Sequence, residues 1–106
     1  MLPATPTAWL DSFSAGVARD SGGVCARLLS PQFRAAMERD AHESCAAYYA
    51  RAQVLSVRVR ILRLGATAAI EVRYFPRGGY STFVLNRQTS GWQAVAIVPG
   101  GPLPIA

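Results

Sequence analysis

Apolar and polar residues alternate through most of residues 54–98, with a period of two that is typical of β-strands with one buried face. The alternation predicts four strands, at residues 54–63, 67–75, 80–87 and 92–98. Glycine and proline occur in the intervals between them, where they favour turns. Intervals this short force each strand to run antiparallel to the one before it. We therefore expect an antiparallel meander.

The alternation also assigns side chains to the two faces of the sheet. One face is expected to be apolar and to pack on helices, with Leu55, Val57, Val59 and Ile61 from the first strand and Ala68, Ile70, Val72 and Tyr74 from the second. The other face is expected to be an interaction surface with Arg58, Arg60, Glu71 and Arg73. The last strand is apolar on both faces apart from Gln93, so we expect it to be central or well covered.

Apolar side chains recur at helical spacing in the first half of the chain, beginning with Trp9 and Phe13. Thr5-Pro6 and Ser30-Pro31 each place a capping hydroxyl before a proline, which is a typical start of a helix. Ser21-Gly22-Gly23 is expected to end the first helix. Short helices are expected at about residues 24–29, from Pro31 to a break at Asp40–His42, and at about residues 43–52.

A chain of 106 residues is large enough for one hydrophobic core. We expect a single α+β domain over residues 1–106, in which N-terminal helices pack on a four-stranded antiparallel sheet. Its parts are an extended lead (1–6), a helical half (7–52), a β-meander (53–98) and a tail rich in proline and glycine (99–106). No apolar run approaches the roughly 20 residues that a membrane-spanning helix needs.

The basic residues are unevenly distributed. All 11 are arginine; residues 1–52 hold five arginines and five acids, whereas residues 53–106 hold six arginines and only Glu71, a net charge of +5. An arginine-rich sheet face could meet an acidic partner, an anionic lipid surface or nucleic acid. It could equally be a solvated face that discourages aggregation. Phe75 is the only aromatic residue expected on that face, which disfavours nucleic acid.

Cys25 and Cys45 both lie in the helical half. A bond between them would close a loop of about 21 residues and stabilise the fold by roughly 3 kcal/mol in an oxidising compartment. As free thiols they would instead act as small buried hydrophobes. A metal site is disfavoured, because His42 is the only histidine and no CxxC pair occurs. The sequence therefore favours a disulfide and does not exclude two free thiols.

The order of three motifs resembles the NTF2-like (cystatin-like α+β) superfamily, in particular its small exported or lipoprotein-type actinobacterial members of unknown function. The motifs are Asp20–Pro31 (DSGGVCARLLSP), Ser44–Ala46 (SCA) and Ser90–Gln93 (SGWQ). The resemblance implies a curved sheet that wraps a long N-terminal helix as a cone with a pocket. It also implies a Cys25–Cys45 bond and homodimers through the sheet. It implies no activity, because the superfamily hosts isomerases, dehydratases, transport factors and other functions.

An isomerase of that superfamily needs a carboxylate inside the pocket. Asp11 is expected to face outward, Glu71 lies among arginines, and the other acids flank helix ends, where capping explains them. We therefore assign no catalytic residue, metal or cofactor. A hydrophobic pocket would be lined by Trp9, Phe13, Tyr48, Phe83 and Trp92, which could equally form a filled core.

The expected function is that of a non-catalytic exported accessory or protein-interaction domain, self-associating or binding a partner protein through the arginine-rich face. The alternatives are a protein that binds a small apolar ligand and, less favoured, an isomerase-like or dehydratase-like enzyme. We expect an extracytoplasmic location, secreted or at the cell envelope, with the export or anchor segment absent from this chain. No nucleic-acid partner is expected.

Overall fold

The computed structural model describes residues 2–60, 65–75 and 78–99, with only the backbone for residues 59, 60 and 99. Its helical elements are α1 (Pro6–Gly16), α2 (Ser21–Gly23), the π-helical turn η1 (Val24–Leu28), α3 (Pro31–Ala41) and α4 (Cys45–Ala50). The strands are β1 (Gln53–Arg60), β2 (Thr67–Phe75), β3 (Tyr80–Gln88) and β4 (Gly91–Pro99). Predictions that concern residues 61–64, 76–77 and 100–106 lie outside the described residues.

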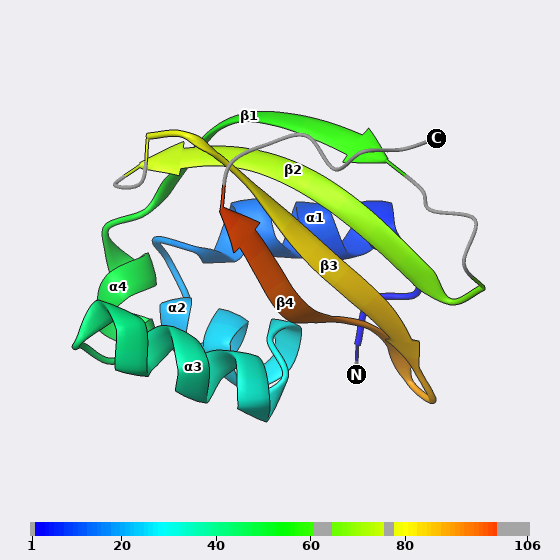
Figure 1. Cartoon of the computed structure of the whole chain (residues 1–106), viewed down its shortest axis with the longest axis horizontal. Coiled ribbons are helices and arrows are strands. Elements are labelled where there is room, and N and C mark those ends of the chain that lie inside the picture. The colour runs from blue at the N-terminus through cyan, green and yellow to red at the C-terminus, as the bar shows by residue number, and fades with distance from the viewer. Residues whose placement is uncertain (1, 61–64, 76–77, 100–106) are drawn as a thin grey trace.

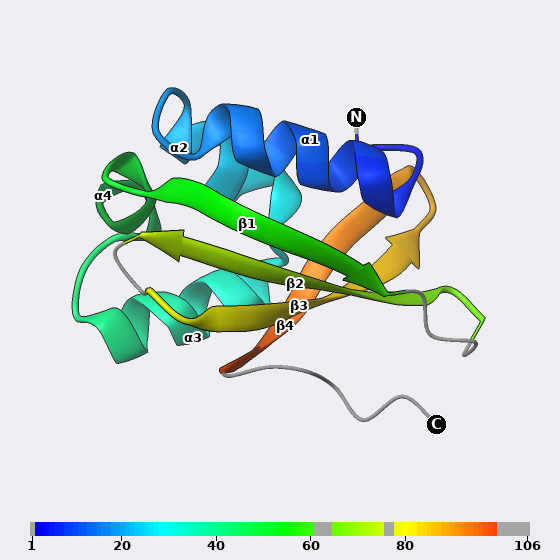
Figure 2. The ribbon, with the colours of Figure 1, turned by 90° about the horizontal axis from the view of Figure 1, so that it is seen from above.

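The four strands form one antiparallel sheet in the order β1-β2-β3-β4, so the predicted meander and the α+β class are confirmed. The sheet is curved and twisted, and α1 lies against one of its faces (Figures 1 and 2). The helix α3 lies beside the β4 edge of the sheet rather than under its centre. None of the described helices covers the opposite face, which we call the outer face.

The first strand departs from the predicted alternation at Leu55. The β1–β2 register shifts between Val54 and Ser56, which makes Leu55 the extra residue of a β-bulge. Val54 therefore packs against the core, whereas Leu55 is 46% exposed. The prediction that Leu55 faces the helices is wrong, because the bulge moves the apolar position by one residue. Beyond the bulge, Val57 pairs with Val72 on the buried face, as predicted.

The helix starts follow the capping residues. The Thr5 and Ser30 hydroxyls accept hydrogen bonds from Ala8 N–H (3.0 Å) and Phe33 N–H (3.2 Å), which confirms the predicted starts of α1 and α3. The prediction that Ser21-Gly22-Gly23 ends the first helix is wrong. The helix α1 ends at Gly16, and residues 21–23 are the first turn of the next helix, because the Asp20 carboxylate accepts a hydrogen bond from Gly23 N–H (3.2 Å).

Aromatic rings fill the space between the helices and the sheet. Phe13 stacks on Trp9 with 5.1 Å between ring centroids, and Phe83 lies 5.1 Å from Phe13. Tyr49 and Tyr74 meet Phe13 edge-on, at 5.6 Å and 6.4 Å. These side chains have almost no exposed surface. Each ring buries a large apolar area in a favourable tilted or stacked geometry, so this cluster is the core that fixes α1 on the sheet.

The strand β4 lies at the edge of the sheet, so the prediction of a central position is wrong. Other parts of the chain cover the first half of its edge. Trp92 N–H donates to the Pro3 carbonyl (2.8 Å), and Ser30 N–H donates to the Ala94 carbonyl (2.8 Å). Further along, Ala96 and Val98 are exposed. The apolar character of β4 therefore reflects the cover over the first half of its edge and, further along, the packing of Ile97 against the core.

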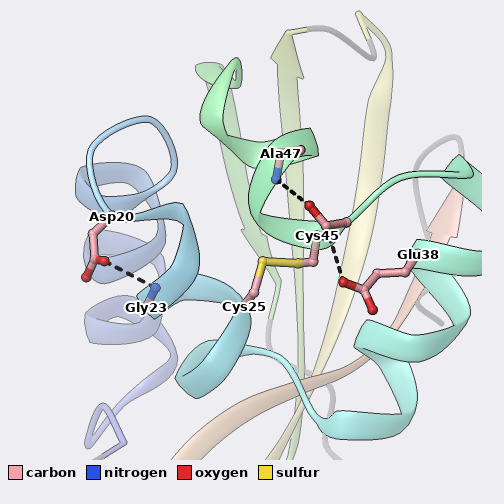
Figure 3. The surroundings of a disulfide bond; sticks show 7 residues. Asp20, Gly23, Cys25, Glu38, Cys45 and Ala47 are labelled. Carbon is pink, nitrogen blue, oxygen red and sulfur yellow. Dashed lines mark hydrogen bonds between the residues drawn. A yellow bond between two sulfur atoms is a disulfide. The ribbon is translucent and has the colours of Figure 1, made fainter.

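A disulfide joins Cys25 of η1 to Cys45 at the start of α4, with 6.0 Å between their Cα atoms (Figure 3). Both residues are buried. The α4 start is also fixed by Glu38, whose carboxylate accepts a hydrogen bond from Cys45 N–H (2.8 Å), and by the Ser44 cap. Of the two arrangements that the sequence left open, the structure has the bond.

Candidate functional site

The outer face presents its side chains in rows that cross the strands. One row holds Ser56, Arg73 and Tyr80 on β1, β2 and β3. The next holds Arg58, Glu71, Thr82 and Val98, one from each strand. The predicted grouping of Arg58, Glu71 and Arg73 on one face is therefore observed. The backbone of Arg60 pairs with Ala69 one row further on. The Arg60 side chain is not among those that the structure describes.

Tyr80 links three strands across this face. Its hydroxyl lies 2.9 Å from the Ser56 hydroxyl, so the side chain extends from β3 across β2 to β1. The Arg58 guanidinium stacks over the same ring, with Cζ 4.7 Å from the centroid. Such a cation–π contact orders an arginine side chain that would otherwise be free to move.

Tyr80 is not among the residues that the sequence analysis predicted for this face. The signal that could have located it was present. Phe83 and Leu85 are buried core residues, so the alternation along β3 puts Tyr80 and Thr82 on the opposite face.

Glu71 lies at the centre of the outer face and is only 1% exposed. Its register neighbours are Arg58 on β1 and Thr82 on β3, and Thr82 is equally buried. Burial of a carboxylate is costly unless opposite charge or hydrogen bonds compensate. Its register neighbour Arg58 carries the opposite charge, and Glu71 and Thr82 expose almost no surface. The central part of the face is therefore closed to water.

Exposed groups surround this closed centre. Arg58 and Arg73 are exposed and basic, Phe75 is 53% exposed, and Val98 is 41% exposed. A sheet face that combines exposed aromatic and aliphatic side chains with ordered arginines is typical of a surface that meets another molecule.

The five residues proposed to line a pocket lie in different surroundings. Trp9, Phe13 and Phe83 have no exposed surface and contact one another as core. Trp92 is partly buried against that core near the N-terminal lead. Tyr48 is the member of the set that lines a surface hollow.

That hollow is one half of a groove between α3 and β4, which we call the α3–β4 groove. Its inner half, about 370 Å³, is lined by Met37, Asp40, Ala41, Tyr48, Tyr49, Tyr74 and Ile97. Its outer half, about 290 Å³, is lined by Gln32, Phe33, Ala36, Met37, Asp40, Val95, Ala96 and Ile97. The two halves share Met37, Asp40 and Ile97, so they lie next to one another between α3 and β4. No local pattern in the sequence indicates this groove, because its walls are far apart along the chain.

Away from these surfaces, Glu43 and Arg51 form an ion pair. The Arg51 guanidinium donates two hydrogen bonds to the Glu43 carboxylate (2.8 and 2.7 Å), and these bonds lower the pKa of Glu43 and raise the pKa of Arg51. Asp11 and Arg19 line an open hollow of about 610 Å³ between α1 and β1, and both are exposed.

Within residues 2–60, 65–75 and 78–99, no group of three or more His, Cys, Asp or Glu side chains is placed to hold a metal ion. Among the same residues no helix is long and apolar enough to cross a membrane.

Comparison with protein-family models, with curated proteins and with solved structures finds no match to this chain. The resemblance to the NTF2-like superfamily stays a prediction.

Proposed function

We propose that this chain is an exported, non-catalytic accessory domain of the NTF2-like type that binds a partner protein through its outer face. The observation that supports this most directly is the composition of that face. Exposed Phe75 and Val98 flank the ordered Arg58 and the exposed Arg73, and no described helix covers them. The Cys25–Cys45 disulfide agrees with a location outside the cytoplasm, since such bonds persist in oxidising compartments.

The charge of the chain favours an acidic partner over a second copy. The net excess of +5 lies entirely in the sheet half, and the only acid of that half, Glu71, is buried. Two copies meeting through this face would bring exposed arginines together, which is unfavourable without acidic groups opposite them. A partner with carboxylates beside an apolar patch would match both the charge and the exposed Phe75.

The test compares two double variants that change the net charge equally. Arg58→Ala with Arg73→Ala removes the outer-face charges, and Arg34→Ala with Arg39→Ala removes two from α3. Binding of a fluorescent poly-glutamate peptide is measured by anisotropy at low salt. We expect the outer-face pair to weaken binding several-fold and the α3 pair to have little effect. Equal losses would mean that only net charge matters and would overturn the proposal. Light scattering that shows a dimer, dissociated by the outer-face pair, would replace the acidic partner with a second copy.

A second candidate function is the binding of a small apolar ligand in the inner half of the α3–β4 groove. The volume of about 370 Å³ and the lining by Met37, Tyr48 and Ile97 favour it, because small-molecule sites are concave and mostly apolar. Titration with an apolar fluorescent dye, with Met37→Glu as the variant that should abolish the signal, tests this candidate. An unchanged signal in the variant would exclude it.

A further inference from the structure

The outer edge of β4 is paired with the rest of the chain over only part of its length. Leu29 forms a parallel bridge with Ala94, and Ser30 N–H donates to the Ala94 carbonyl. Pro31 then begins α3, so the chain leaves the sheet edge at that point. Among the described residues, backbone hydrogen bonds from other segments to this edge end at Ala94. Leu29 thus occupies the place of a fifth strand beside β4, but only for one residue.

The α3–β4 groove lies where that fifth strand position would continue. The residues of β4 that follow Ala94 form one wall, namely Val95, Ala96 and Ile97, and α3 forms the other. A groove between a helix and a strand edge suits an extended peptide, because the edge offers main-chain donors and acceptors while the helix wall receives side chains.

We propose that the α3–β4 groove binds an extended segment of a partner protein, which adds to β4 as a fifth strand. Alternate side chains of a strand point the same way, about 6.5–7 Å apart. The two halves of the groove follow one another along α3 and share Met37 and Ile97, so each half receives one of two alternating apolar side chains. This inference is independent of the outer-face proposal, since it concerns another surface and another kind of contact.

The charges of the groove indicate the composition of the segment. Asp40 is the one charged residue among those described that line the two halves, in a chain with a net charge of +5. A basic side chain beside the two apolar ones would pair with Asp40. A second copy fits less well, because residues 95–98 of its own β4 (VAIV) carry no basic group and two copies of net charge +5 repel each other.

The first test uses a peptide of sequence Ser-Val-Thr-Val-Thr-Lys, N-acetylated and labelled with fluorescein at its C-terminus, in which both valines and the lysine lie on one side of the strand. It is compared with the same peptide N-methylated at alternate amides. We expect the unmodified peptide to bind and the methylated one to bind about tenfold more weakly or worse, because N-methylation removes main-chain donors and keeps the side chains. In amide NMR spectra of the labelled protein, the largest shifts should fall on Val95, Ala96 and Ile97. Absence of binding, or equal binding of both peptides, would overturn the proposal.

The second test uses neighbouring alanines on α3. Ala36 lines the groove and Ala35 is exposed, so Ala36→Arg should block the peptide and Ala35→Arg should not. Arginine is a good helix former, and circular dichroism checks that both variants fold. Asp40→Lys, at an exposed position, tests the role of the Asp40 charge separately. The native protein should bind the peptide with Lys more tightly than the same peptide with Glu in place of Lys, and Asp40→Lys should bind the peptide with Glu more tightly. An unchanged preference contradicts the assigned role of Asp40, and a dimer that Ala36→Arg dissociates in the absence of peptide would make a second copy the occupant.

Discussion

Tyr80 shows how one side chain can organise a sheet face. It lies across β2, bonds to Ser56 on β1 and carries the Arg58 guanidinium on its ring. The buried Glu71 lies in the next row of the face, between Arg58 and Thr82. The Arg58 side chain is therefore ordered before any partner arrives, and ordering of side chains before binding reduces the entropy lost in the complex.

This arrangement predicts a graded response to substitution of Tyr80. Tyr80→Phe removes the hydrogen bond to Ser56 and should lower the free energy of unfolding by about 0.5–1.5 kcal/mol. Tyr80→Ala also removes the contact with Arg58, which adds about 0.5–1 kcal/mol or more. Phe75→Ala, at an exposed position on the same face, should cost less than either. Urea denaturation measures all three, and a loss for Phe75→Ala as large as that for Tyr80→Ala would contradict the linking role of Tyr80.

At the scale of elements, polar side chains decide where the helices of the first half begin. Thr5, Ser30 and Ser44 each accept a hydrogen bond from a backbone N–H three residues on, and Asp20 does the same for Gly23. The cap of Asp20 requires glycine at position 23, because a Cβ there would collide with the Asp20 carboxylate. At Gly22 a Cβ meets no atom within 4 Å, so that glycine is not required by space.

The two glycines therefore provide a matched pair of substitutions. Gly22→Ala should stabilise the protein by up to about 1 kcal/mol, because alanine is the better helix former and restricts the unfolded chain. Gly23→Ala should destabilise it by about 0.5–2 kcal/mol through loss of the Asp20 cap. Thermal unfolding followed by circular dichroism measures the opposite shifts in Tm. Equal shifts for the two variants would show that the cap does not determine the start of α2.

The elements that the sequence predicted well are those with a local cause. The alternation from Thr67 to Phe75 gave β2 at its observed bounds, and the hydroxyl–proline pairs gave the starts of α1 and α3. Leu55 was misplaced because a bulge depends on pairing with another strand. The α3–β4 groove was missed for a similar reason. Its walls meet only after the sheet has formed, and no local pattern records which segments will be neighbours.

At the scale of the whole molecule, the disulfide joins η1 to the start of α4. Cys25 lies in η1, which continues to the Leu29 bridge with β4, and Cys45 begins α4, which leads directly into β1. The bond thus ties segments next to the two opposite edge strands of the sheet. The helix α3, which forms one wall of the α3–β4 groove, lies within the closed loop, and α4 begins at its end, so the bond also restrains the geometry of that groove.

The last prediction concerns this restraint. Cys25→Ala with Cys45→Ala should lower the free energy of unfolding by about 3 kcal/mol, because the unfolded chain regains the entropy of a loop of about 21 residues. Urea denaturation of the native protein with and without a phosphine reductant should show a similar loss, and the double variant should not respond to reductant. Intact mass after alkylation provides the control, since thiols should be modified only after reduction. Equal denaturation midpoints with and without reductant would contradict the stabilising role, because the same loop would then be held by packing alone.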